Sequence, residues 1–244
     1  MSDPEKSCAA PPESGSSHLP LFLDLKDRSV VIFGGGSVSE RKAGLFSLYA
    51  PVRVISRDFS SGLLEMAGEP SRRLELIRCN LSRTASAELS RFVRGAFIAI
   101  PATSDSGLNA AIEEVCEREG VLINRVEGVG DVVVPSIIRK GSIAIALTTE
   151  VPGFTRYLRR HLEEALPDSY VLMARLLSQI RRENRQLISS QRERAAIIRR
   201  ILEDEQVWRL LSVSYEKAYM RARSHAGLDE RDSLDAGDAQ EGLH

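Results

Sequence analysis

The chain has 244 residues, of which 43% are apolar, and its 33 Lys and Arg against 34 Asp and Glu give a net charge of -1. This length is enough for one large domain or two small ones. The balanced charge gives no reason to expect a nucleic acid or a membrane as a partner. Cys8, Cys79 and Cys116 lie far apart without C-x-x-C spacing, which favours a reducing compartment and predicts neither a disulfide framework nor a metal site.

The two ends of the chain differ in composition from its body. Residues 1–18 are rich in Ser, Pro and Glu, and residues 226–244 are acidic with few large apolar side chains, so we expect both tails to be disordered. The N-terminal stretch lacks the charged and apolar regions of a signal peptide. No apolar run approaches the ~20 residues that span a bilayer. A cytoplasmic protein is expected.

Strand-like and helix-like segments alternate through residues 19–124. The expected strands are Val30–Phe33, Val52–Ser56, Leu74–Arg78, Ala96–Ile100 and Val121–Ile123. The expected helices are Val38–Leu48, Ala85–Phe92 and Leu108–Glu119, and residues 56–61 should form a loop. This alternation predicts βαβ units and a parallel sheet, which is the Rossmann-like α/β class.

The pattern changes after residue 124. Residues 132–150 contain two strand-like runs around Arg139-Lys140-Gly141 and predict an antiparallel hairpin, with Pro135 placing the first run at an edge or a bulge. Four helical segments should follow, at 157–166, 170–188, 194–202 and 207–223, with Pro167 and Asp168 separating the first two. We therefore expect a dinucleotide domain (19–124), a small β segment (125–150) and a helical domain (151–225).

Three glycines follow the first expected strand and precede the first expected helix. Glycine permits the sharp turn that lets backbone N–H groups approach a phosphate at a helix N-terminus. The sequence reads Gly34-x-Gly36-x-x-Ser39, so a serine replaces the third glycine of the dinucleotide fingerprint. The competing interpretation is a plain strand-to-helix turn.

Polar residues at the ends of the next strands are candidate cofactor contacts. Asp58 could hold the ribose of NAD, whereas Arg57 could pair with the 2′-phosphate of NADP, or both could be solvated loop charges. Thr103 could contact the cofactor or cap the following helix, as could Asp105. Asn109, about one turn later, could face the same crevice.

Two acids follow the fifth expected strand. A carboxylate at Glu127 could take a proton while a hydride leaves, and Asp131 is a second candidate. The alternative for both is a surface acid.

Basic residues gather later in the chain. The last three, Arg156, Arg159 and Arg160, are spaced so that they share a helix face and could bind the carboxylates of an acidic substrate. The alternative is a solvated face paired with Glu163 and Glu164, and His161 beside it is expected to be structural or solvated. The basic residues are Arg139, Lys140, Arg156, Arg159 and Arg160.

Four stretches of the chain together resemble one family. They are LPLFLDLKDRSVVIFGGGSVSERKAGLF, IAIPATSDSGLNAAI, LINRVEG and VVVPSIIRKGSIAIALTTEVPGFTRYLRRHLEEALP, in that order from Leu19 to Pro167. The chain is thereby similar to the precorrin-2 dehydrogenase family, which includes the dehydrogenase/ferrochelatase module of siroheme synthase.

The resemblance implies NAD-dependent oxidation of precorrin-2, a carboxylate-rich tetrapyrrole, to sirohydrochlorin, the precursor of siroheme. Some members also insert ferrous iron. It implies a homodimer in which residues 125–149 contribute to the contact, and it gives Asn109, Arg139, Arg156 and Arg160 a substrate to bind. The implied cofactor contacts are Gly34, Gly36, Ser37, Val38, Asp58, Phe59 and Thr103.

The sequence departs from the family pattern around the expected acid. Glu127 stands where the family has aspartate, the loop after it is about two residues shorter, and Thr149 matches a family serine. These departures leave Asp131 open as the acid. Two further functions stay open as well: a chelatase without redox activity, and a non-catalytic protein that senses a dinucleotide.

Overall fold

The structure is a computed structural model that describes residues 18–81 and 86–226. The chain divides into two compact units, with the boundary between Val134 and Pro135. Residues 125–134, expected to start a separate β segment, group with the first unit because the Val132 N–H bonds to the Ile123 carbonyl oxygen at 3.1 Å. The predictions of disorder for residues 1–17 and 227–244 lie outside the described residues.

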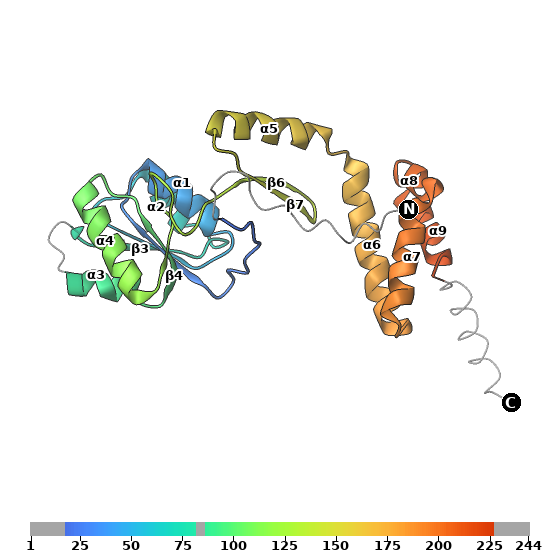
Figure 1. Cartoon of the computed structure of the whole chain (residues 1–244), viewed down its shortest axis with the longest axis horizontal. Coiled ribbons are helices and arrows are strands. Elements are labelled where there is room, and N and C mark those ends of the chain that lie inside the picture. Colours follow the sequence, from blue (N-terminus) through green and yellow to red (C-terminus); the bar gives the residue numbers. More distant parts are fainter. Residues whose placement is uncertain (1–17, 82–85, 227–244) are drawn as a thin grey trace. The chain divides into compact units, whose positions relative to one another are not determined.

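The first unit is built on a five-stranded parallel sheet with strand order β3-β2-β1-β4-β5. Figure 1 shows this sheet with helices α1 to α4 around it. All five strands fall where the sequence predicts them, within one residue at each end. They are β1 (Ser29–Phe33), β2 (Val52–Ser56), β3 (Leu74–Arg78), β4 (Ala96–Pro101) and β5 (Leu122–Ile123). The α/β class predicted from the alternating segments is confirmed.

Each face of this sheet is covered by a pair of helices. Val30 and Ile32 of β1 are buried with α1 and α2, whereas Val31 and Phe33 are buried with α3 and α4. A strand that is buried on both faces has a continuous run of apolar residues, and this run predicted β1 from the sequence. The helices are α1 (Ser37–Phe46), α2 (Ser61–Ala67), α3 (Ser86–Val93) and α4 (Ser106–Glu119).

The sequence did not predict helix α2, because Ser60 and Ser61, where it begins, were interpreted as part of a loop. Ser60 is its N-cap, and its hydroxyl oxygen accepts from the Leu63 N–H at 3.4 Å. The Ser60 hydroxyl also donates to the Glu40 carboxylate at 2.6 Å. A cap that is also bonded to α1 fixes this short helix beside the glycine turn.

The second unit begins with an antiparallel hairpin of β6 (Ser136–Lys140) and β7 (Ile143–Leu147), in which Ile138 pairs with Ile145. The hairpin around Gly141 is confirmed, but its first strand begins later than predicted. The run 132–134 is not part of it, because Val132 bonds to the end of β5 in the first unit.

Helices complete the second unit. Their core contains Leu176, Ile180 and Ile197, all essentially inaccessible to solvent. The single helix predicted at 207–223 is two helices, because Ser214 caps a new helix at the Lys217 N–H. Their bounds are α5 (Pro152–Ala165), α6 (Asp168–Leu187), α7 (Gln191–Glu203), α8 (Glu205–Leu211) and α9 (Tyr215–Ser224). Among the described residues, no helix is both long and apolar enough to cross a membrane.

Candidate functional site

The glycine turn lies where the chain reverses its direction of winding across the sheet. Strand β1 has β2 on one side and β4 on the other, and β4 follows β3 in sequence. The Ala102 N–H, just after β4, bonds to the Phe33 carbonyl oxygen at the end of β1 at 2.8 Å. Ligands of doubly wound sheets bind beyond the carboxyl ends of the strands at this switch point.

Close packing requires glycine at the first two positions of the turn. Gly34 has a φ of 115°, and a Cβ atom there would lie 2.4 Å from the Ala102 carbonyl oxygen. A Cβ atom on Gly35 would lie 1.9 Å from the Asp58 carbonyl oxygen, whereas one on Gly36 would meet nothing within 4 Å. The turn is therefore packed against β2 and β4 on one side and open on the other.

The N-terminus of α1 has backbone donors available to a ligand. Gly36 is the N-cap with extended backbone, and no side chain of the described residues caps this helix. The first N–H groups of a helix have no partner within the helix, so those of Ser37 and Val38 suit a pyrophosphate. Ser39, at the third fingerprint position, is fully buried, so its side chain faces the interior.

A cavity of about 720 Å³ opens at this turn. All of the residues predicted to contact the cofactor line it, and the structure thus brings three strand ends and a helix N-terminus together. These are Gly34, Gly36, Ser37, Val38, Asp58, Phe59 and Thr103, and the cavity is also lined by residues that the sequence analysis did not select, such as Ser56, Asn80 and Leu108.

Arg57 and Asp58 form the rim of the cavity after β2. The Arg57 Nε atom lies 2.7 Å from the Asp58 Oδ2 atom, and the two side chains are 76% and 72% exposed. Such an exposed pair contributes little to stability. The Arg57 charge is nevertheless balanced by its neighbour.

Thr103 and Asn109 hold the loop after β4. The Thr103 hydroxyl donates to the Asn109 Oδ1 atom at 2.7 Å, and the Asn109 Nδ2 atom donates to the Thr103 carbonyl oxygen at 3.0 Å. Asp105 caps α4 by accepting from the Leu108 N–H at 3.1 Å. Both ends of the Asn109 amide are thus used to orient Thr103 at the cavity.

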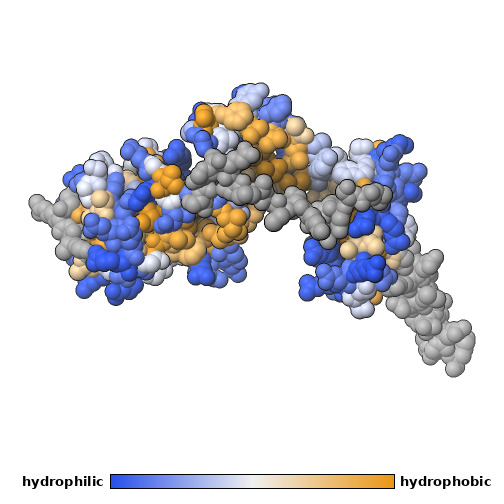
Figure 2. All heavy atoms as spheres, viewed as in Figure 1, coloured by the Kyte–Doolittle hydropathy of each residue, from blue (hydrophilic) through white to orange (hydrophobic). Residues whose placement is uncertain are grey.

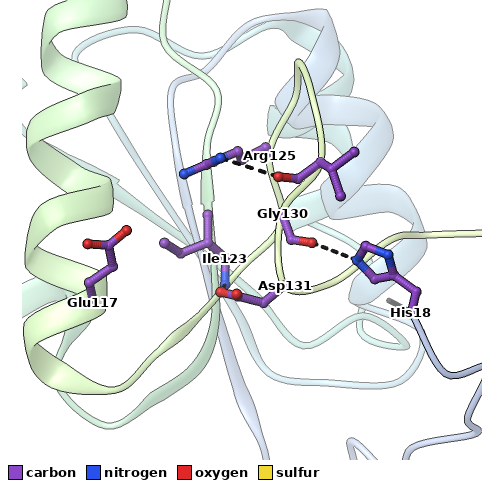
Figure 3. Close-up of a pocket in the computed structure, with 7 residues that line it drawn as sticks. His18, Glu117, Ile123, Arg125, Gly130 and Asp131 are labelled. Carbon is purple, nitrogen blue, oxygen red and sulfur yellow. Dashed lines mark hydrogen bonds between the residues drawn. The ribbon is translucent and has the colours of Figure 1, made fainter. Parts of the chain in front are cut away.

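Asp131 lies in a second cavity, of about 370 Å³, at the β5 edge of the sheet (Figure 3). The two cavities have no lining residue in common. The Asp131 Oδ2 atom accepts from the Ile123 N–H at 2.9 Å, and the His18 Nε2 atom bonds to the Gly130 carbonyl oxygen. Arg125, which also lines this cavity, forms an ion pair with Glu113 at 3.0 Å.

Glu127 is exposed in the loop between β5 and Asp131 and lines neither of these two cavities. The structure therefore brings neither predicted acid into the wall of the glycine cavity. Both belong to the loop 125–131, which follows β5.

Lys42 and Asn124 connect α1 to this loop and were missed as site residues. The Lys42 Nζ atom donates to the Asn124 Oδ1 atom at 2.7 Å. Burial, together with the charge of Arg41, lowers the pKa of Lys42 below its ordinary value. Both residues stand in the stretches that carry the family resemblance, but only the fold brings these distant positions into contact.

Of the four predicted substrate residues, Arg139, Arg156 and Arg160 belong to the second unit. Asn109 lies on α4 of the first unit, where its amide bonds to Thr103 and it does not line the glycine cavity. Arg156 and Arg160 are exposed on α5, whereas Arg159 pairs with Glu163, as the solvated-face alternative predicts for that residue. The basic run thus contains two kinds of arginine.

The metal-ligating residue types are spread out in the part of the chain that the structure describes. No three His, Cys, Asp or Glu side chains within it are grouped to hold a metal ion. The His161 ring stacks on Tyr157, with centroids 6.2 Å apart.

The sheet order and the cavity define a Rossmann-type protein with a site suited to a dinucleotide. Residues 21–136 match the family model described as "Putative NAD(P)-binding". The chain is 41% identical over 209 residues to precorrin-2 dehydrogenase of Methanosarcina barkeri, with 85% of this chain and 92% of that protein covered. The chain belongs to the precorrin-2 dehydrogenase family.

Other relatives agree with this assignment. The siroheme synthase of Methylococcus capsulatus is 32% identical over 191 residues, which are 76% of this chain and 38% of that longer protein. The solved structure of SirC, precorrin-2 dehydrogenase, superposes with a TM-score of 0.68 at 21% identity, covering 85% of this chain and all of that one. The latter shows that the folds are alike.

Proposed function

We propose that this protein oxidises precorrin-2 to sirohydrochlorin with NAD as the hydride acceptor. The observation that carries the proposal is the glycine cavity at the switch point, in a chain similar over most of its length to a precorrin-2 dehydrogenase. The residues around the cavity fit a dinucleotide, since they offer uncapped N–H donors, a close backbone turn and a carboxylate at the rim.

The nicotinamide ring, when bound, supplies the chemistry of accepting a hydride. The protein's own part is to bind and orient. The N–H groups of Ser37 and Val38 bind the pyrophosphate, and Asp58 binds the ribose hydroxyls. Asn109 holds Thr103 against the cofactor through the two hydrogen bonds of its amide.

NAD is preferred over NADP because of the charges at the rim. The Asp58 carboxylate would repel a 2′-phosphate, and the Arg57 guanidinium that could attract one is already paired with Asp58. The support is the 2.7 Å contact between the two side chains.

Glu127 removes the proton that accompanies the hydride. Its exposed position on the loop after β5 leaves its carboxylate accessible to a substrate. Asp131 is the less suitable acid, because its carboxylate already accepts a backbone hydrogen bond from Ile123.

The tetrapyrrole is bound by Arg139, Arg156 and Arg160. Guanidinium groups match the carboxylates of such a macrocycle, and Arg156 and Arg160 are exposed one helical turn apart on α5. Arg159 between them has its charge paired with Glu163 and is excluded from this role.

The protein acts as a homodimer through the hairpin and α5. No residue of α5 is buried, although Phe154 and Tyr157 are large aromatic residues, 53% and 57% exposed. In Figure 2, hydrophobic residues, coloured orange, are exposed on the surface over the hairpin and part of α5. Apolar surface of this kind marks a protein–protein contact.

An anaerobic assay of the purified chain with precorrin-2 tests the function. We expect the absorbance of sirohydrochlorin to appear with NAD, much more slowly with NADP, and not at all without a dinucleotide. Dinucleotide binding without turnover would contradict the proposal and favour a sensor. Parallel reactions with ferrous iron and sirohydrochlorin show whether the chain also inserts the metal.

A further inference from the structure

Lys42 crosses from the helix that borders the glycine cavity to the end of β5. It lies in the second turn of α1, and its Nζ atom donates to the Asn124 Oδ1 atom at 2.7 Å. Asn124 is 3% exposed and is itself fixed to the sheet, because its N–H bonds to the Ala99 carbonyl oxygen at 2.9 Å. The contact therefore joins two rigid elements that are 82 residues apart in sequence.

Asn124 also bonds to Val132, directly after the far end of the loop 125–131. Its Nδ2 atom donates to the Val132 carbonyl oxygen at 2.6 Å, and the Val132 N–H bonds to the Ile123 carbonyl oxygen at 3.1 Å. The two ends of the loop are thus clamped side by side at one buried amide. Glu127 lies inside the clamped segment.

The burial and the hydrogen bond of the Lys42 amine indicate a structural contact and not a solvated surface charge. The side chain is half-buried, and its charge is not balanced by an acid, because none of the ion pairs found among residues 18–81 and 86–226 includes it. An apolar residue in its place would leave the buried Asn124 oxygen without its donor, which costs free energy. The amine thus orients the amide that closes the loop.

We propose that Lys42 is a positioning residue: through Asn124 it fixes the loop 125–131, which carries the acid, relative to the helix whose first turn binds the dinucleotide. This inference rests on the proposed function. Hydride and proton leave one substrate, so the acceptor and the acid must be held in one geometry, and small misplacements slow such reactions strongly.

The variant Lys42→Met tests the connection with two independent readouts. Hydrogen exchange should become faster at the amides of Ile123 and Val132, which close the loop. The kcat for precorrin-2 oxidation should fall by about tenfold or more, while the Kd for NAD stays at the wild-type value. Lys42→Arg, which keeps a charged donor of similar reach, should restore much of both.

Arg41→Met is the matched control, because it removes the same charge from the neighbouring, exposed position. It should behave as the wild type in both readouts. If Lys42→Met does not fold, Lys42→Gln, which keeps a neutral donor one atom shorter, should show a smaller change in the same direction.

Two results would overturn the inference: unchanged exchange with unchanged kcat, or a loss confined to the affinity for NAD. The exchange measurement does not depend on turnover. If the wild-type chain does not oxidise precorrin-2, the proposed function fails, while faster exchange in Lys42→Met still supports the connection.

Discussion

The two acids of the loop 125–131 differ in what their carboxylates contact. Both residues are exposed, but the Asp131 carboxylate accepts a hydrogen bond from the Ile123 N–H and so completes the edge of the sheet, whereas the Glu127 carboxylate has no hydrogen-bond partner among the described residues. At the scale of single residues, the division is between an acid that stabilises the loop and an acid available to a substrate.

Glu127→Gln should lower kcat for precorrin-2 oxidation by roughly 10²-fold or more, the range for loss of a general base. The Kd for NAD should not change, because Glu127 does not line the glycine cavity. Asp131→Asn is the matched control, since the amide keeps an oxygen for the Ile123 N–H. A strong loss of kcat in Asp131→Asn with a normal rate in Glu127→Gln would reverse the two assignments.

Helix α5 shows how one element can carry charges of different kinds. Its Arg159 pairs with Glu163 four residues on, while Arg156 and Arg160 are exposed. An arginine already paired within its helix has less to offer a ligand than an exposed one. The three arginines are therefore close in sequence but differ in function: Arg156 and Arg160 are available to a ligand, and Arg159 is paired within the helix.

The double variant Arg156→Gln/Arg160→Gln should raise KM for precorrin-2 about tenfold, the effect of losing one or two charge-assisted hydrogen bonds. The initial rate at several precorrin-2 concentrations measures it, with NAD saturating. Arg159→Gln is the control and should leave KM near the wild-type value. A larger rise in KM for Arg159→Gln than for the double variant would contradict the proposal, because it would show that the substrate binds at Arg159.

The junction between α7 and α8 is held by Asp204. Its Oδ2 atom lies 2.6 Å from the Arg221 Nε atom and 2.8 Å from the His225 Nε2 atom, and its Oδ1 atom accepts from the Gln206 N–H. Burial acts to raise the pKa of Asp204, but the hydrogen bonds from Arg221 and His225 outweigh it and lower the pKa to about 2. The carboxylate thus ties the last helix to the start of α8.

Because this pKa is depressed on folding, the stabilisation is present above the unfolded pKa of about 3.9 and is lost as the pH falls toward 2. Asp204→Asn should lower the free energy of unfolding by about 2 kcal/mol at pH 7, measured by urea denaturation followed by circular dichroism. The difference from the wild type should disappear near pH 2.

Glu205→Gln is the control for Asp204, because it removes a charge from the next residue, whose pair with Arg209 is exposed. Its effect should stay below about 0.5 kcal/mol. A pH-independent loss in Asp204→Asn would show that the carboxylate charge does not stabilise the junction.

At the scale of the whole molecule, the chain separates its tasks between two units. The first contains both cavities, and the second contains the proposed substrate arginines and the exposed apolar residues of α5. The second unit has an internal core between its later helices, yet α5 has no buried residue. This helix is where a second copy of the chain is expected.

The wild-type chain should have twice the mass of one chain by size exclusion with light scattering. Phe154→Glu should shift it toward the monomer, because a charge would be buried without a partner in the contact. Val213→Glu is the control, since Val213 is also exposed in the second unit but lies between α8 and α9. A wild-type monomer at micromolar concentration would contradict the proposed homodimer.

Most of the fold could be predicted from local pattern. The apolar runs of β1 to β5 and the periodic helices between them are each legible over a short stretch. The starts of α2 and α9 were not predicted, because each depends on a single capping serine, Ser60 or Ser214. Serine is equally common in loops and turns. The late start of the hairpin depends on a bond from Val132 to Ile123, which no local pattern reveals.

The sequence by itself determined the parallel α/β sheet, the glycine turn and the family, because strand burial and the demand for glycine leave a mark on neighbouring residues. Only the tertiary structure decided that Asn109 orients Thr103 and that Lys42 reaches Asn124. Those contacts join positions separated by a helix turn or by several elements. Their geometry arises from the packing of elements, which residue identities along the chain do not encode locally.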